Sequence, residues 1–259
     1  MARVLITGSA DGLGLMAAQR LSAQGHAVTL HARSEIRGED ARRACPKLER
    51  VLVGDLASLA ETRALAAAAN ATGPYDAVIH NAAVGYTIGK RAETVDGLEQ
   101  HFQINVLAPY VLTALMTPPS RLVYLSSGMH RGGTPDLSDA QWKTRRWNGS
   151  QAYSDTKLHD TTLAFAIARR WPTVLANSVS PGWVATKMGG AGAPDDLPAA
   201  SVTQSWLAVS DDPAAKVTGQ HLYHQEREDV HPATRDERFQ DALLAYCAQL
   251  SDVPLPVVG

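Results

Sequence analysis

A tyrosine and a lysine four residues apart form a pair whose types and spacing could do chemistry. Tyr153 and Lys157 lie in the stretch AYSDTK (152–157), which we expect to be helical. On a helix this spacing places both side chains on one face, about one turn apart. A cation held near a phenol lowers the pKa of the phenol, so the pair suits proton transfer. The alternative is two residues on a solvated helix surface.

A glycine-rich stretch near the N-terminus could bind a phosphate. The sequence TGSADGLG (7–14) follows an apolar run and leads into a helical pattern, with glycines at 8, 12 and 14. Glycines allow a tight turn and a close approach of phosphate to backbone N–H groups, and a helix N-terminus favours negative charge. The spacing is G-x3-G-x-G rather than G-x-G-x-x-G, so simple turn chemistry stays open as an alternative.

Short apolar runs alternate with helical stretches and must position these residues. We expect strands at 3–7, 27–31, 50–53, 76–80, 121–126 and 173–179, with 221–223 as a seventh candidate, and helices that include 14–24, 35–44 and 58–70. Such alternation predicts an α/β fold with a parallel sheet covered by helices on both faces. We find no composition break that would mark a linker, so residues 1–259 are expected to form a single domain.

Two segments interrupt this rhythm and are expected to bind substrate. Residues 128–150 and residues 183–200 both follow strand ends, where open α/β sheets bind ligands. The second segment contains KMGGAGAPDDLP, and its glycines at 189, 190 and 192 suit a lid that closes over a ligand. A merely flexible connection is the alternative.

Composition excludes several classes of function. A net charge of −2 implies no pull toward nucleic acid, and no run approaches the ~18 apolar residues of a membrane span. Two cysteines, Cys45 and Cys247, make a disulfide framework unexpected and fit a reducing, cytoplasmic location. We expect no metal either, because His221 and His224 would face opposite sides of a strand.

Several further motifs follow the expected strands in order. They are Asp55 after the third strand, HNAA (80–83) after the fourth, Asn105 in a helix, Ser126 and Ser127 after the fifth strand, the YSDTK stretch, and PGWVAT (181–186) after the sixth. Together these residues resemble the short-chain dehydrogenase/reductase family over roughly residues 3–225. Ser127 and Tyr153 are 26 positions apart, and this long spacing resembles the retinol-dehydrogenase-like branch.

The resemblance implies a Rossmann-type doubly wound sheet of about seven strands and four catalytic residues. Tyr153 would be the general acid/base, Lys157 would lower its pKa and bind the nicotinamide ribose, and Ser127 would hold the substrate oxygen, although it could simply end a strand. Asn105 would bind a water through its carbonyl. Proline at 109 supports this last role, because it has no N–H to bond to that carbonyl. A simple proline kink is the alternative.

The resemblance also implies where a dinucleotide cofactor binds. Asp55 would bond the adenine amine, and HNAA, which has Ala83 where the family usually has glycine, would run beside the cofactor. The full set is Gly8, Ser9, Asp11, Gly12, Leu13, Gly14, Arg33, Ser34, Asp55, Leu56, Asn81, Ala82, Ala83, Tyr153, Lys157, Pro181, Gly182, Val184 and Thr186.

Cofactor choice depends on the end of the second strand. NAD-preferring folds place an acidic residue there, but position 32 is alanine and Arg33 follows it. A guanidinium can bind a 2′-phosphate through two hydrogen bonds, and Ser34 and Ser9 could add donors. Asp11 and Glu35 weigh against this. We expect NADP(H) to be preferred, with NAD(H) as the other possible cofactor.

These patterns predict an NADP(H)-dependent oxidoreductase that interconverts a carbonyl and an alcohol. Trp142, Trp147, Met129 and His130 in the segment after Ser127 favour an apolar, bulky substrate, unless the tryptophans only anchor that segment. A homodimer or homotetramer is expected from the resemblance. The alternatives are a non-catalytic NAD(P)-binding regulatory protein, and a dehydratase or epimerase of the family's extended version.

Overall fold

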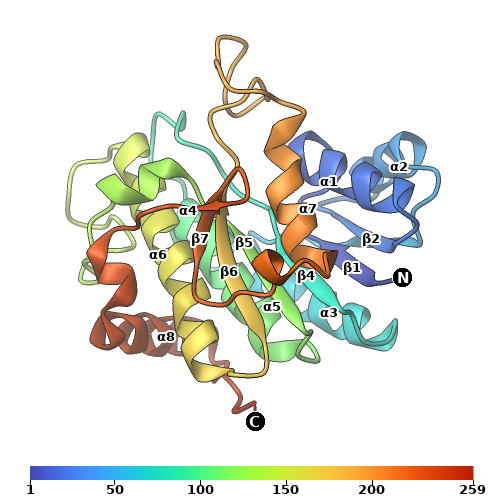
Figure 1. The fold of residues 1–259 in the computed structure, drawn as a ribbon. Coiled ribbons are helices and arrows are strands. Elements are labelled where there is room, and N and C mark those ends of the chain that lie inside the picture. Colours follow the sequence, from blue (N-terminus) through green and yellow to red (C-terminus); the bar gives the residue numbers. More distant parts are fainter. Residues whose placement is uncertain (259) are drawn as a thin grey trace.

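The computed structural model, which describes residues 1–258, contains one sheet of eight strands in the order β3-β2-β1-β4-β5-β6-β7-β8 (Figure 1). The strands are β1 (Arg3–Ile6), β2 (Ala27–Ala32), β3 (Arg50–Val53), β4 (Ala77–His80), β5 (Arg121–Leu125), β6 (Leu175–Ser180), β7 (His221–Tyr223) and β8 (Glu226–Arg227). The first seven are parallel and β8 is antiparallel to β7. The predicted doubly wound α/β fold is therefore confirmed.

The eighth strand is an addition that the sequence pattern did not predict. A strand of two residues is too short to show any alternation of apolar and polar side chains. It pairs with β7 across a tight turn in which His224 and Gln225 both have positive φ angles. That conformation matches the turns that join adjacent antiparallel strands.

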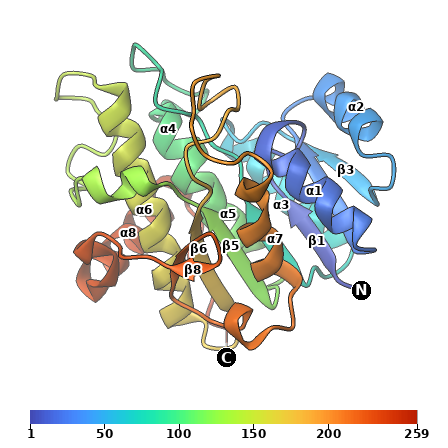
Figure 2. The same cartoon turned by 45° about the horizontal axis from the view of Figure 1, so that its top comes forward.

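Helices cover both faces of the sheet (Figures 1 and 2). The helices are α1 (Gly12–Ala23), α2 (Glu35–Ala44), α3 (Leu59–Ala71), α4 (Gln100–Phe102), α5 (Ala108–Leu115), α6 (Gly149–Arg170), α7 (Val202–Val209) and α8 (Glu237–Ser251). One apolar cluster joins the sheet to α1, α2 and α7, and another joins it to α3, α5, α6 and α8. The core thus lies in two layers, one on each side of the strands.

Helix boundaries follow from capping side chains. Ser34 accepts a hydrogen bond from the N–H of Arg37 and starts α2, and Ser58 does the same for α3 through Glu61. The predicted bounds of α2 match the structure, and those of α3 are off by one residue at each end. Helix α1 begins at Gly12 rather than Gly14, because the glycine loop continues directly into the helix.

Asn105 lies in an unusual piece of helix. Residues Gln103–Leu107 form a π-helical turn between α4 and α5, and Ala108 donates its N–H to the carbonyl of Gln103, five residues back. Pro109 follows immediately and cannot donate a backbone hydrogen bond. The wider π-helical turn fits a helix in which the proline interrupts the series of i→i−4 hydrogen bonds.

Thr7 ties the end of β1 to the segment after β4. Its side-chain oxygen accepts hydrogen bonds from the N–H groups of Asn81 at 3.0 Å and Ala82 at 3.1 Å, and the residue is buried. These bonds hold the glycine loop against HNAA, so two loops that are distant in sequence become one surface.

We predict that Thr7→Val destabilises the fold by about 1–3 kcal/mol, because two part-buried N–H groups lose their bond to the Thr7 hydroxyl while side-chain shape is kept. Urea denaturation measures the change in the free energy of unfolding, provided that the m-value stays the same. Thr7→Ser keeps the hydroxyl and should lose clearly less stability. Equal losses for the two variants would show that the hydroxyl is not what matters.

Candidate active site

The predicted site residues gather at the carboxyl edge of the sheet, where β1, β4, β5 and β6 end. Above this edge rises the loop 183–200, drawn in orange, which leads into α7 (Figures 1 and 2). The structure thus places the glycine loop, HNAA, Ser127 and Tyr153 near one another, as expected of ligand-binding residues in open α/β sheets.

Tyr153 is buried and in contact with Ser127. The residue is 6% exposed, and the Ser127 hydroxyl lies close enough to the Tyr153 hydroxyl to lower its pKa. Ser127 also accepts a hydrogen bond from the N–H of Met129 at 3.2 Å, which fixes the hydroxyl beside the tyrosine. The two groups that the sequence separates by 26 positions could therefore act on the same substrate oxygen.

Ser126 faces the opposite way. Its hydroxyl is buried, donates to the carbonyl of Lys157 at 3.1 Å and lies 2.7 Å from the hydroxyl of Thr161. Successive residues of extended chain point to opposite sides, which is why adjacent serines have different partners. Ser126 fastens α6 to the end of β5, and Ser127 is the one beside Tyr153.

Lys157 is buried one turn along α6 from Tyr153. Its ammonium donates to the carbonyl of Leu125 and lies 3.5 Å from a carboxylate oxygen of Asp160. Burial lowers the pKa of Lys157, and the charge of Asp160 opposes that effect. The ammonium lies 5.8 Å from the centre of the Tyr153 ring.

The expected depression of the Tyr153 pKa is not what the structure shows. Burial raises the pKa of Tyr153, the hydrogen bond from Ser127 opposes the rise, and the charge of Asp160 adds to it. The spacing of Tyr153 and Lys157 could not show that Asp160 would lie nearby. In the folded protein burial and the charge of Asp160 together raise the pKa of Tyr153, so the tyrosine holds its proton across the neutral range.

Asn105 connects the tyrosine helix to the segment after β4. Its side-chain oxygen accepts from the N–H of Val84 at 2.7 Å, and its amide nitrogen donates to the Val84 carbonyl at 3.1 Å and to Thr156 at 3.0 Å. Thr156 lies between Tyr153 and Lys157 in α6. Asn105 therefore fixes the position of that helix relative to HNAA.

The glycine loop is shaped by close backbone contacts. A Cβ at position 8 would lie 2.7 Å from the Cα of Ala82, and one at position 14 would lie 2.5 Å from Nδ2 of Asn81. That Asn81 amide donates to the carbonyls of Thr7 and Gly8. Gly12 has a φ of 55° where α1 begins. Ala83 occupies its position half-buried, so the extra methyl fits.

This cradle fits a dinucleotide. The first N–H groups of α1, from Gly12 to Gly14, have no partner within the helix and can receive a pyrophosphate. Leu13 lies half-buried in this first turn. Beside β3, Leu56 is buried, and Asp55 accepts a hydrogen bond from Ala57 through one carboxylate oxygen.

Two of the predicted phosphate donors are already engaged. The Ser9 hydroxyl donates to the carbonyl of Ile6 at 2.7 Å and accepts from the N–H of His31, and Ser34 caps α2. The expectation that both hydroxyls face a 2′-phosphate is therefore wrong for Ser9, which is fully buried. The sequence could not show that the loop would use this hydroxyl to close on itself.

Arg37 is a site residue that sequence reasoning missed. Its guanidinium lies 2.6 Å from the carboxylate of Asp11, which also pairs with Lys187 at 2.9 Å. Burial alone would raise the pKa of Asp11, but these ion pairs outweigh it and lower the pKa. Arg33 is exposed. The signal for Arg37 was its place in the first turn of α2, which follows β2 directly.

The segment after β6 reaches back over the site. Gly182 has a φ of 86°, and a Cβ there would lie 2.7 Å from the carboxylate of Asp195. Val184 is buried and pairs with Asp195 in an isolated bridge, whereas Thr186 and Pro181 are half-buried. The same carboxylate accepts the N–H of Trp183, so residues 181–195 form a closed loop.

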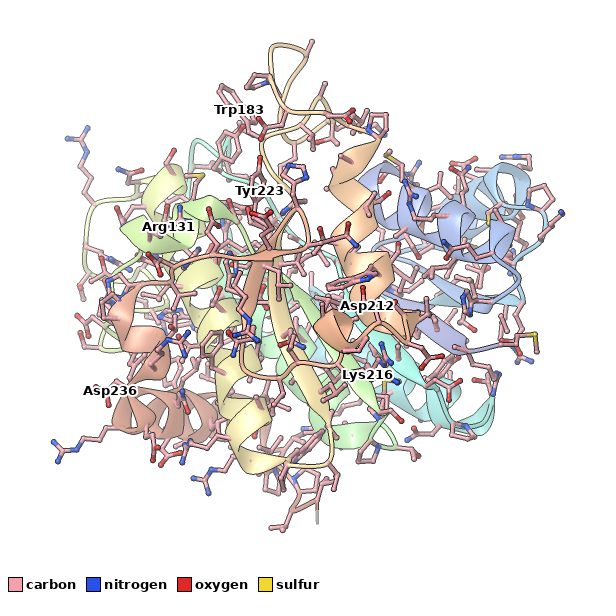
Figure 3. The ribbon with its side chains drawn as sticks, in the orientation of Figure 1. Arg131, Trp183, Asp212, Lys216, Tyr223 and Asp236 are labelled. Carbon is pink, nitrogen blue, oxygen red and sulfur yellow. The ribbon has the colours of Figure 1, made fainter. Side chains whose placement is uncertain are left out.

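Trp183 is 56% exposed and is not part of the core (Figure 3). Its indole N–H donates to the carbonyl of Gly189 at 2.9 Å. The Tyr86 hydroxyl donates to the same carbonyl at 3.5 Å. The ring of Tyr86 meets that of Tyr153 edge-on at 5.7 Å. Tyr86 is thus a second missed residue, and it connects the loop above the site to the candidate acid/base.

The tryptophans after Ser127 anchor their segment. Trp142 is buried, with the guanidinium of Arg145 3.5 Å from its ring centre and the Trp147 ring at 5.3 Å. Trp147 donates to the carbonyl of Ile88 at 3.0 Å. Trp142 therefore only anchors the segment after Ser127. Of the two tryptophans, Trp147 is the one that is half-exposed, near residues 84–88.

Neither a metal-binding cluster nor a membrane-spanning helix is found among the described residues. Within residues 1–258, no cluster of three or more histidine, cysteine or acidic side chains is arranged to hold a metal ion. Over the same residues, no helix has both the length and the apolar character needed to cross a bilayer.

Comparison with known proteins gives one consistent answer. Residues 2–196 match the short chain dehydrogenase family. The chain is 45% identical to an uncharacterized oxidoreductase of Emericella nidulans, covering 99% of each chain, and 40% identical to a short-chain dehydrogenase of Penicillium rubens, covering 99% of this chain and 100% of the other. It is 31% identical to human retinol dehydrogenase 13 over 72% of this chain and 60% of that protein.

A solved structure shows the same architecture. An uncharacterized protein of Mycobacterium paratuberculosis superposes with a TM-score of 0.86 at 26% identity, covering 99% of this chain and 96% of that one. With the sheet order, the glycine cradle and the buried tyrosine–lysine pair, these matches show that the chain belongs to the short-chain dehydrogenase/reductase family, in its retinol-dehydrogenase-like branch.

Proposed function

We propose that this oxidoreductase uses NADP(H) to interconvert a carbonyl and an alcohol, with Tyr153 as general acid/base. The observation that carries the proposal is the buried contact between Tyr153 and Ser127 above Lys157. The family assignment supports NAD(P)-dependent oxidoreduction, and the phosphate preference and the acid/base role are our inference.

Each residue has a role that its position supports. A bound nicotinamide cofactor supplies or accepts the hydride. In carbonyl reduction Tyr153 gives its proton to the developing alkoxide, and its raised pKa means that the proton is present at neutral pH. Ser127 donates a hydrogen bond to the same oxygen. Lys157 brings a positive charge that favours the tyrosinate left behind.

The non-catalytic alternative explains the site less well. A protein that only binds a dinucleotide needs the glycine loop and HNAA, and it gains nothing from a buried lysine beneath a buried tyrosine. Burying such ionisable groups costs stability unless each is paired. Here the hydroxyl of Tyr153 is directed at Ser127, which suits turnover better than binding alone.

We propose that the substrate is apolar near its carbonyl. The Tyr86 ring packs against Tyr153, and Met188 lies so close to Gly85 that a Cβ there would be 2.5 Å from its Cγ. Aromatic and thioether groups form adaptable apolar walls. These residues, rather than Trp142, provide the apolar surface that we expected beside the acid/base.

Tyr153→Phe is expected to lower kcat for carbonyl reduction by about 100-fold or more, because only the transferable proton is lost. Cofactor affinity, measured by fluorescence titration, should stay close to wild type. Tyr75→Phe removes a hydroxyl bonded to Thr29 elsewhere in the core and serves as the control. A Tyr153→Phe enzyme with most of its activity would refute the assignment.

Preference for NADP(H) is the second expectation. Arg33 is exposed and lies two residues after His31, whose carbonyl accepts a hydrogen bond from the N–H of Ser9 in the glycine loop. Arg37 places a further positive charge against Asp11. A charge-assisted contact with a 2′-phosphate is worth about 1.5–3 kcal/mol, or roughly ten- to hundred-fold in affinity. Arg33→Ala should therefore lower the NADPH-to-NADH affinity ratio by about that factor.

Isothermal titration of both cofactors measures this ratio. Arg43→Ala removes another exposed arginine, from the last turn of α2, and should leave the ratio unchanged. The preference is disproved if wild type binds NADH as tightly as NADPH, or if Arg33→Ala behaves like the control.

The loop 187–200 is expected to close over the cofactor. Lys187 reaches from this loop to Asp11 in the glycine loop, where we propose that the cofactor phosphates bind. Hydrogen exchange of 187–200 should therefore slow when NADPH is added, while exchange in α8 stays constant. Equal exchange in the loop with and without NADPH would rule out a closing lid.

A further inference from the structure

Asp160 is a buried acid that the proposed reaction does not use. It lies three residues after Lys157 on α6, and its side chain is 2% exposed. One carboxylate oxygen lies 3.5 Å from the lysine ammonium, and the other has no hydrogen-bond partner among residues 1–258. A second carboxylate on the same helix, Asp155, is bound by Arg145, Thr134 and Gln151.

The fold has no need of Asp160. A buried carboxylate with an unpaired oxygen is costly, and an apolar side chain of similar volume is often neutral or better for stability. Burial raises the pKa of Asp160, and only Lys157 opposes the rise. The group therefore lowers stability unless its charge does something for the lysine.

The charged groups around Asp160 are few. Lys157 and Tyr153 face it from α6, and Tyr124 faces it from β5, with His80 of β4 stacked behind at 4.8 Å. Tyr124 and His80 share hydrogen bonds with Thr113 of α5. Burial lowers the pKa of His80 to about 3 and raises that of Tyr124, so both are neutral near pH 7. Asp160 therefore acts mainly on Lys157 and Tyr153.

We propose that Asp160 is a positioning residue that keeps Lys157 charged and held against the end of β5, so that the two form one ionised unit beneath Tyr153. The proposal rests on the function given above. Lys157 donates to the Leu125 carbonyl and is paired with Asp160, which leaves one ammonium proton for a ribose hydroxyl. Without the carboxylate, the partner left to the buried ammonium among residues 1–258 would be the neutral Leu125 carbonyl.

The pH dependence of turnover tests this role. In Asp160→Asn, Lys157 loses its counter-ion and gives up its proton more readily, and Tyr153 loses a nearby negative charge. Both effects move the alkaline limb of kcat for carbonyl reduction to lower pH, by about one unit or more. Asp160→Leu should show the same shift, because the change comes from charge rather than shape.

Asp155→Asn is the matched control. It removes another buried carboxylate from α6, and it should leave the alkaline limb in place although Arg145 loses one of its two acidic partners. An unmoved limb in both Asp160 variants overturns the proposal, as does the same shift in the control.

Thermal melts without any cofactor provide a second readout. A carboxyl whose folded pKa is raised contributes stability that is present below its unfolded pKa, near 4, and is lost as pH rises through the folded pKa. A lysine whose folded pKa is lowered makes the fold more stable as pH rises toward 10.5. The Tm of Asp160→Asn minus that of wild type should therefore increase steadily from pH 5 to pH 9.

A Tm difference that is flat or falls with pH overturns the proposal even if turnover changes. If the wild-type protein reduces no carbonyl, the proposed function fails, and the melts still decide whether Asp160 and Lys157 form one ionised pair. Should Asp160→Asn fail to fold, Asp160→Leu supplies both measurements.

Discussion

The ammonium of Lys157 is buried, and much of the active site is arranged around that constraint. A charge in the interior needs acceptors within reach, and this one has the Leu125 carbonyl and the Asp160 carboxylate. Reaching the first requires α6 to pack directly on the end of β5, which the Ser126 bonds to Lys157 and Thr161 secure. The same packing places Tyr153 beside Ser127, so the position of the acid/base follows from the position of the lysine.

A second constraint is the close approach of backbones at the cofactor side. Gly8 and Gly14 lie where any side chain would collide with Ala82 or Asn81. Asn81 then donates two hydrogen bonds to Thr7 across the gap, from its backbone N–H to the side-chain oxygen and from its side-chain amide to the carbonyl. Asn105 continues the connection from Val84 to Thr156, between Tyr153 and Lys157. Through these contacts the dinucleotide cradle and the proton-transfer site form one continuous structure.

Charges at the glycine loop show how neighbouring ion pairs change the electrostatic effect of a residue. The carboxylate of Asp11 in the glycine loop would by itself repel a phosphate. In the folded protein it lies between Arg37 and Lys187, so two cations offset its charge, and Arg37 also pairs with Asp40. The pairing of Lys157 with Asp160 is the same kind of charge neutralisation in the protein interior. Weaker dielectric screening there makes the interaction between the two charges stronger.

The sequence by itself determined the order of the seven parallel strands along the chain, because each is a short apolar run between turn or helix signals, whereas β8 is too short to show any pattern. It also determined that Ser126 and Ser127 would diverge, since that follows from the geometry of an extended chain. Only the tertiary structure decided which groups those residues meet. Arg37 meets Asp11, Tyr86 meets Tyr153, and Ser9 bonds back to Ile6, across gaps that no local pattern records. The pKa of Tyr153 was decided in the same way, because it depends on burial and on every nearby charge, and neither exists until the chain has folded.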